Sequence, residues 1–139
     1  MSKTLIIVLS IISFIIILAI IGAKRRETKL RALIDSREPL AKEDYVKHFI
    51  KKGFTKKHIE VLHDKLNEFI GLEGYSVYPD DDLRELYGFE DLDDIEFINQ
   101  IIIELNLRQL NDADYNETER YVKLFNAEYI LTLIKKVNE

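Results

Sequence analysis

The sequence predicts an all-α protein, with a single N-terminal transmembrane helix followed by a small helical bundle. Three observations support this fold class. Residues 4–23 form an uncharged apolar run, apolar residues in the rest of the chain recur at helical spacing, and helix-ending residues separate the periodic segments. We expect a transmembrane anchor and basic juxtamembrane stalk at residues 1–34 and one helical domain with one core at residues 35–139.

The apolar run from Thr4 to Ala23 predicts a permanent membrane anchor. As a helix, its 20 residues reach about 30 Å, which is the hydrocarbon thickness of a bilayer. A cleaved signal peptide is the alternative, but its apolar region would be shorter and a small-x-small cleavage site would follow. Here Ile21 occupies the position three residues before a cut at Ala23, and basic residues follow at once. We therefore favour a single-pass anchor that contacts the lipid bilayer through Thr4–Ala23.

The charges beside the anchor predict its orientation. Five basic residues follow the run, whereas only Lys3 and the terminal amine precede it. The positive-inside rule then places the C-terminal domain in the cytoplasm. Anionic headgroups would also attract the basic stretch. The five residues are Lys24, Arg25, Arg26, Lys29 and Arg31.

Apolar spacing and capping residues predict six helices in the domain. We expect them at about residues 40–52, 56–70, just after Asp82, 91–105, 118–125 and from 127 onward. Thr55, Asp82 and Asn126 are the expected N-caps, and Gly53 is expected to end the first helix. The side chains expected inside are Tyr45, Phe49, Ile50, Ile59, Leu62, Leu66, Phe69, Ile70, Ala127, Ile130, Leu131, Ile134 and Val137.

The domain is acidic, which limits its partners. Residues 35–139 hold 24 Asp and Glu against 14 Lys and Arg, and residues 73–119 hold 15 against two. Nucleic acid is excluded as a partner, because its phosphate backbone requires neutralisation by Lys and Arg. The acidic surface suits a protein partner with a basic surface, or serves solubility alone.

The segment from Gly88 to Phe97 opens the helix with the clearest functional pattern. Two apolar stripes are expected along it. One would face the core, and the other would face a second surface, either another helix or a partner protein. The first contains Leu92, Ile95, Asn99 and Ile102, and the second contains Phe97, Ile98, Ile101 and Leu105. Glu90 and Asp91 lie at the expected helix start, where carboxylates accept free backbone N–H groups.

This segment, Gly-Phe-Glu-Asp-Leu-Asp-Asp-Ile-Glu-Phe, resembles the acyl carrier protein signature Gly-x-Asp-Ser-Leu-Asp-x-Val-Glu-Leu. Leu92, Asp93 and Glu96 are identical to it. The resemblance covers about residues 56–136 and implies a carrier-like bundle. In that family the signature serine carries phosphopantetheine, but here Asp91 replaces it. A carboxylate cannot form the phosphodiester, so the resemblance implies a fold without the cofactor or the acyl-carrying activity.

No residue pattern predicts an enzyme or a metal site. The acidic run at residues 80–82 lacks the alternating ligands and the glycine of a calcium loop, so we expect a capping role. His48, His58 and His63 lack metal-ligand spacing and are expected to be solvated or lightly packed. The serines at positions 36 and 76 have no catalytic context. We predict no catalytic residue, no cofactor and no metal.

The functional hypothesis is a membrane-anchored, non-catalytic interaction or accessory subunit. Either the helix at 40–52 covers the apolar patch that contains Ile102 and Ile103, or this patch is a standing protein interface, and we favour the interface. Alternatives are a membrane-tethered acyl carrier in lipid synthesis and a small membrane-anchored immunity or inhibitor protein. The predicted partner-binding residues are Leu92, Asp93, Ile95, Glu96, Asn99, Ile102 and Ile103.

Overall fold

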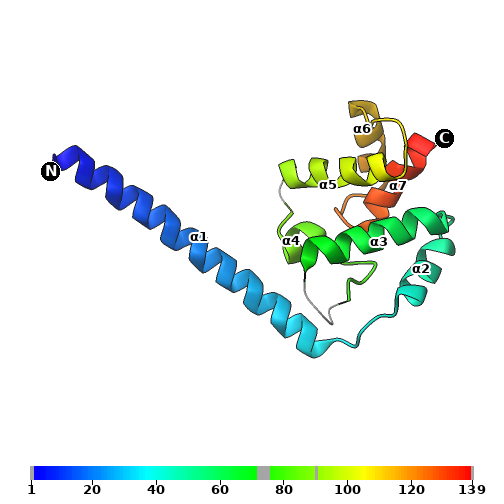
Figure 1. Cartoon of the computed structure of the whole chain (residues 1–139), viewed down its shortest axis with the longest axis horizontal. Coiled ribbons are helices and arrows are strands. Elements are labelled where there is room, and N and C mark those ends of the chain that lie inside the picture. The colour runs from blue at the N-terminus through cyan, green and yellow to red at the C-terminus, as the bar shows by residue number, and fades with distance from the viewer. Residues whose placement is uncertain (1, 72–75, 90, 139) are drawn as a thin grey trace. The chain divides into compact units, whose positions relative to one another are not determined.

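The computed structural model describes residues 2–71, 76–89 and 91–138, and this part of the chain contains seven helices and no strand (Figure 1). The predicted all-α class is therefore confirmed. The helices are α1 (Lys3–Ser36), α2 (Lys42–Ile50), α3 (Lys56–Ile70), α4 (Leu83–Tyr87), α5 (Asp91–Glu104), α6 (Asp112–Tyr121) and α7 (Ala127–Asn138). The chain forms two compact units, Met1–Ser36 and Arg37–Glu139.

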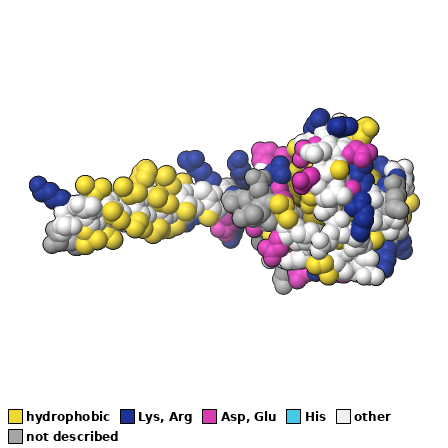
Figure 2. All heavy atoms as spheres, turned by 90° about the horizontal axis from the view of Figure 1, so that it is seen from above, with side chains coloured by type: hydrophobic (Ala, Val, Ile, Leu, Met, Phe, Trp, Pro, Cys, Tyr) yellow, Lys and Arg dark blue, Asp and Glu magenta, His cyan; other side chains and the backbone are white. Residues whose placement is uncertain are grey.

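The first unit is the helix α1. Its large apolar side chains, from Leu5 to Ile21, are exposed on every side, and Figure 2 shows them along its length. Among the described residues, only the stretch Lys3–Leu33 is long and apolar enough to cross a membrane. A helix that is apolar all round is expected to lie in lipid or against protein, because exposing this much apolar surface to water is unfavourable.

The helix α1 continues beyond the apolar run into the basic stalk. Arg31 forms an ion pair with Glu27 one turn earlier, at 2.7 Å, and such i,i+4 pairs support an exposed helix. The hydroxyl of Ser36 donates to the carbonyl of Leu33 at the last turn. Pro39 follows shortly afterwards and disfavours helical geometry in the residue before it. The helix thus ends close to the position that the sequence predicts.

In the second unit, α3 lies at the centre of the bundle. The helices α2, α5 and α7 pack against it, and α6 packs on α7. In the view of Figure 1, α2 lies below α3 and α5 lies above it. The core consists of the apolar side chains that these helices share. Its fully buried members include Tyr45, Phe49, Ile59, Leu62, Leu66, Leu83, Ile98, Ile101, Ile102, Ile130, Leu131 and Leu133.

Two predicted N-caps form the expected hydrogen bonds. The carboxylate of Asp82 accepts from the backbone N–H groups of Arg84 and Glu85, and the side chain of Asn126 accepts from the N–H of Tyr129 at 3.0 Å. Thr55 stands at the N-cap position of α3, but its side chain makes no capping hydrogen bond. The Thr55 backbone is extended, and its carbonyl accepts the first helical hydrogen bond of α3 from the Ile59 N–H.

The helix predicted at 118–125 is wrong in its position, because α6 begins at Asp112. The side chain of Asn111 accepts from the N–H of Asp114, and the carboxylate of Asp114 accepts from the N–H of Asn111. This reciprocal capping box fixes the earlier start. Two burial predictions are also wrong, since Ile50 and Phe69 each remain 44% exposed.

Candidate functional site

A cluster of aromatic rings positions the start of α5. Gly88 ends α4 with φ +70°, a left-handed conformation that glycine adopts without strain. The chain then buries Phe89. Its ring stacks on that of Phe69, with 4.2 Å between the ring centroids, and forms an edge contact with Phe97, with 5.1 Å between the centroids. The aromatic contacts of Phe89 and Phe97 therefore fix which face of α5 points into the bundle.

The helix α5 buries one apolar stripe, formed by Ile98, Ile101, Ile102 and Leu105. These positions follow the i, i+3, i+4, i+7 spacing of a single helix face. Ile102 is only 2% exposed, so its predicted place on an exposed partner-binding surface is wrong. The two-stripe pattern assigned Ile102 to the same row as Ile95 and Asn99. Its helical angle lies at the border of the two rows, about 40° from Ile98, and packing turns its side chain into the core.

The outer face of α5 carries exposed apolar side chains. Ile103 is 74% exposed and Ile95 is 49% exposed. Glu96 and Asn99, which lie between them in the sequence, are exposed as well. The positions 95, 99 and 103 follow i+4 spacing, which places them on one side of the helix. The helix α2, which packs on α3, does not cover Ile103. We call this surface, formed by Ile95, Glu96, Asn99 and Ile103, the outer α5 face.

One residue of the predicted site falls elsewhere on α5, and the side chain of another lies outside the described residues. Asp93 is exposed, but its helical angle lies away from the outer α5 face. The side chain of Leu92 and that of Asp91, which replaces the carrier serine, lie outside the described residues, as does Glu90. The described backbone begins α5 at Asp91, which is the predicted start.

An ion pair between a buried carboxylate and a half-exposed guanidinium joins α4 to α5. The Nε and Nη2 atoms of Arg84 donate to Oδ2 of Asp94 at 2.8 and 2.6 Å. The Asp94 side chain is buried, and the Arg84 guanidinium also lies 4.7 Å above the ring of Phe125. Two charge-assisted hydrogen bonds to one carboxylate oxygen hold the two side chains in a fixed geometry. This pair therefore holds the first turns of α5 against α4.

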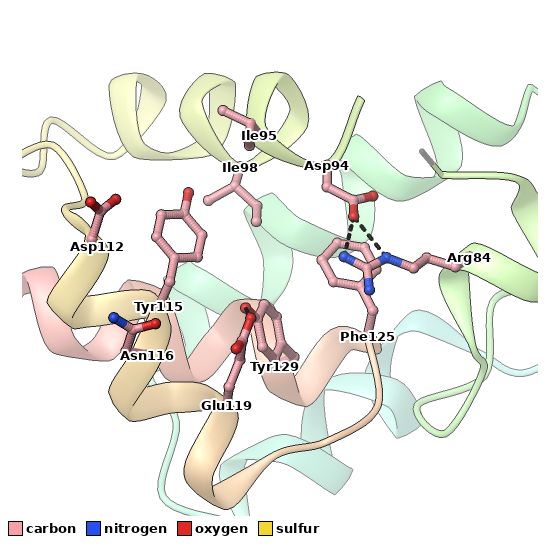
Figure 3. Close-up of a pocket in the computed structure, with 10 residues that line it drawn as sticks. All are labelled: Arg84, Asp94, Ile95, Ile98, Asp112, Tyr115, Asn116, Glu119, Phe125 and Tyr129. Atoms are coloured by element: carbon pink, nitrogen blue, oxygen red, sulfur yellow. Dashed lines mark hydrogen bonds and ion pairs between the residues drawn. The ribbon is translucent and has the colours of Figure 1, made fainter. Parts of the chain in front are cut away.

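Beside Ile95 lies a cleft of about 490 Å³ between α4, α5, α6 and α7 (Figure 3). Ile95 belongs both to the outer α5 face and to the cleft wall. Because Arg84 neutralises Asp94, the carboxylates of Asp112 and Glu119 give the cleft a negative charge. The residues that line it are Arg84, Asp94, Ile95, Ile98, Asp112, Tyr115, Asn116, Glu119, Phe125 and Tyr129.

Two tyrosines of this cleft stay neutral around physiological pH. Burial and the nearby Glu119 carboxylate raise the pKa of Tyr129 to about 12, and the Tyr129 hydroxyl lies 3.4 Å from that carboxylate. Burial and Asp114 also raise the pKa of Tyr115 above its usual value. The cleft therefore offers hydroxyl donors, two carboxylates and an apolar floor, a combination suited to binding a cationic or amphipathic group.

The histidines are more buried than the sequence predicts. His58 and His63 are nearly inaccessible, and the ring of His63 lies 4.8 Å from that of Tyr45 and contacts the Asn67 amide. Burial lowers the pKa of both histidines. In the described part of the chain, no group of three His, Cys, Asp or Glu side chains is arranged to hold a metal ion.

Apart from Ile95, the cleft as a binding site and the Arg84–Asp94 pair were missed by sequence reasoning. The lining comes from four helices, and no local spacing links Arg84 to Glu119 or Tyr129. The one available signal is the Asn111-x-x-Asp114 cap, which would have placed Asp112, Tyr115 and Glu119 on one helix. This signal is weak, because the residue at the third helical position is Asp114, whereas the usual capping box has glutamate or glutamine there.

Comparisons with known protein families, with curated proteins and with solved structures find no match to this chain.

Proposed function

We propose that this chain is a membrane-anchored, non-catalytic interaction subunit that binds a partner protein through the outer α5 face. The observation that carries the proposal is the exposure of Ile103, at 74%, beside Ile95, at 49%. Burying an isoleucine side chain in an interface contributes about 1.5–3 kcal/mol. Two such residues on one helix face, with polar Glu96 and Asn99 between them, resemble an apolar anchor with a polar rim.

The cleft beside Ile95 extends this surface. A partner that packs on Ile103 could insert a side chain between Tyr115 and Phe125, along the apolar floor. The negative charges of Asp112 and Glu119 favour a basic group there. The acidic charge of residues 73–119 supports the same choice of partner, because it would steer a basic surface toward this part of the domain.

The proposal includes the acyl-carrier type of bundle for residues 35–139. Its support is the match of Leu92, Asp93 and Glu96 to the carrier signature. With Asp91 in place of the attachment serine, the domain would use the signature helix for binding and would carry no acyl group. The helix α1 would hold the domain at the membrane, and the basic residues after Ala23 favour the cytoplasmic side.

Site-specific photocrosslinking in the native host tests the proposal. A photoreactive phenylalanine analogue at Ile103 should form a discrete cross-linked product with a partner protein. The same analogue at Tyr121, which is 78% exposed on α6, is the matched control for an exposed large residue and should give no such product. Mass spectrometry then identifies the partner.

A second arm tests whether the product depends on the apolar face. With the analogue held at Asn99, Ile103→Lys should abolish the product, since it places a charge where an apolar contact is needed. The substitution Tyr121→Lys should leave it unchanged. Absence of any product from Ile103 and Asn99, or equal products from Tyr121, would contradict binding through the outer α5 face.

A further inference from the structure

The basic charge of this protein is concentrated in its N-terminal part. Residues 1–57 contain 13 Lys and Arg against five Asp and Glu, whereas residues 58–139 contain seven against 20. Part of this excess lies within the helical domain itself, in residues 42–57. This segment, which we call the basic hairpin, holds six lysines and two acidic residues. It comprises α2, the turn at Gly53 and the first residues of α3.

The basic hairpin combines exposed lysines with accessible apolar surface. The side chain of Ile50 is 44% exposed, and Val46 and Ile50 line a groove of about 290 Å³ between α2 and α3. Lys42, Lys47 and Lys56 stand around the same groove, together with Glu43 and Glu60. An apolar strip bordered by lysines is typical of surfaces that lie at a lipid headgroup layer, because lysine stems cover apolar surface while their ammonium groups reach phosphates.

Some lysines of the basic hairpin form ion pairs within the domain, and others do not. Lys42 pairs with Asp64 at 2.7 Å, and Lys52 pairs with Glu128 at 2.8 Å. Lys47 and Lys56 form longer pairs with Asp44 and Glu60, at 3.9 and 3.8 Å. Lys51 and Lys57 are exposed and have no acidic partner among the residues that the structure describes. Both lysines are close to the turn that joins α2 to α3. They therefore give the end of the basic hairpin a positive charge that is free to meet an external anionic surface.

We propose that the basic hairpin docks on the anionic surface of the membrane that holds α1. The positive charge of the hairpin favours an anionic surface. The domain is covalently joined to α1, so the membrane around α1 is the anionic surface that it meets most often. The stalk from Lys24 to Ser36 is helical, so it spans about 20 Å at most along its axis. A tether of this length keeps the bilayer at high effective concentration, whereas a soluble acidic protein must compete from solution.

This docking has a consequence for the remaining surfaces of the domain. In Figure 1, α5 lies on the other side of α3 from α2. A domain that rests on the membrane through the basic hairpin would therefore present α5 to the aqueous side. The inference rests on the membrane anchoring in the proposed function, but not on the proposed partner binding, because it concerns a different face and a different ligand.

The test uses the full chain reconstituted into vesicles, with a fluorophore on a single introduced cysteine, since the sequence contains no cysteine. Thr55→Cys places the probe in the basic hairpin, and Ala113→Cys places it on α6; both sites are exposed. Vesicles contain phosphatidylcholine alone or phosphatidylcholine with phosphatidylserine, plus a trace of headgroup-quencher lipid. We expect stronger quenching at Thr55 when phosphatidylserine is present, no gain at Ala113, and loss of the gain in high salt.

Charge reversal separates specific docking from general attraction. Lys51→Glu with Lys57→Glu should remove the gain in quenching at Thr55. Arg120→Glu with Lys123→Glu changes the net charge equally, at exposed sites outside the hairpin, and should leave the gain in place. Equal quenching in both vesicle types, an equal gain at Ala113, or loss of the gain in the control variant would overturn the proposal. Loss of the gain on addition of an equimolar soluble acidic protein would also overturn it, because the hairpin would then prefer a protein ligand.

Discussion

Arg37 forms a bidentate ion pair with Asp81, which lies 44 residues later in the chain. The guanidinium donates to both carboxylate oxygens at 2.9–3.1 Å. The same carboxylate accepts from the Tyr87 hydroxyl at 2.7 Å and from the Tyr78 N–H at 2.9 Å. The Arg37 guanidinium also lies 4.4 Å above the Tyr78 ring. The first residue of the domain is thereby fixed to the loop before α4.

Breaking this pair should destabilise the domain strongly. Asp81→Asn removes the charge and leaves Arg37 nearly buried, with 16% of its side chain exposed. Removing one partner of a buried pair typically costs 3–5 kcal/mol, and we expect about 3 kcal/mol because Arg37 retains some access to water. Urea unfolding of the full chain in detergent, followed by circular dichroism, measures the change.

The neighbouring substitution Asp80→Asn is the control for Asp81→Asn. Asp80 is exposed, so its replacement should change the unfolding free energy by less than about 0.5 kcal/mol. Equal effects at the two positions would show that the network around Asp81 contributes nothing beyond a surface charge.

The Arg108–Asp114 pair predicts a specific acid dependence of stability. Hydrogen bonds from Arg108, at 2.8 and 2.9 Å, are the main cause that lowers the pKa of Asp114 from 3.8 to about 2. Since the folded pKa lies below the unfolded value, the stabilisation is complete above pH 3.8 and is lost as the pH falls through about 2. The wild-type advantage over Asp114→Asn in urea midpoint should therefore be constant near neutrality and shrink in that acidic window.

The exposed Asp80→Asn variant serves as the reference for this acid dependence. Its urea midpoint should follow that of the wild type through the same acidic range. An Asp114→Asn difference that persists unchanged below pH 2 would mean that shape or capping at Asp114, and not its charge, stabilises α6.

Local signals in the sequence predict much of the secondary structure. The uncharged run predicts α1, and the oxygen-bearing side chains of Asp82 and Asn126 predict the starts of α4 and α7, because each cap depends on residues only two or three positions away. Every apolar residue predicted to face inward from α7 is buried. These elements need no tertiary information.

The features missed by sequence reasoning depend on tertiary packing. The Arg37–Asp81 pair and the cleft join segments that no local period connects. Ile102 was misplaced for a different reason, since residues 92, 95, 99 and 102 also form a helical row, and only packing decides which of two overlapping rows enters the core. Phe69 was misplaced in the opposite direction. The sequence predicts it to be buried, but it stays partly exposed while its ring stacks on Phe89.

The orientation of α1 can be measured with single cysteines. Ser2→Cys should react with a membrane-impermeant thiol reagent in intact cells, and Asn138→Cys should react only after permeabilisation, because the basic residues after the span favour the cytoplasmic side. The reverse pattern would place the domain outside. A product shortened by about 23 residues would instead identify a cleaved signal peptide.

Ile102 and Ile103 form a matched pair that separates stability from binding, because neighbouring isoleucines on α5 have opposite environments. Ile102 is 2% exposed and Ile103 is 74% exposed. Ile102→Ala should cost about 3 kcal/mol, since truncating a buried isoleucine removes packing and leaves a cavity. That loss should lower the melting temperature of the full chain by well over ten degrees for a domain of this size. Circular dichroism in detergent measures the shift.

The substitution Ile103→Lys should have the opposite profile. It should change the unfolding free energy by less than about 0.5 kcal/mol, because the side chain is already in water. Affinity for the partner identified by crosslinking should fall more than about tenfold, since the lost burial exceeds the 1.4 kcal/mol that corresponds to one decade. Titration of the purified partner into the variant in nanodiscs measures the affinity. If Ile103→Lys lowered the melting temperature as much as Ile102→Ala, or left the affinity unchanged, the outer α5 face would have a structural role or none, and partner binding would have to be sought elsewhere on the domain.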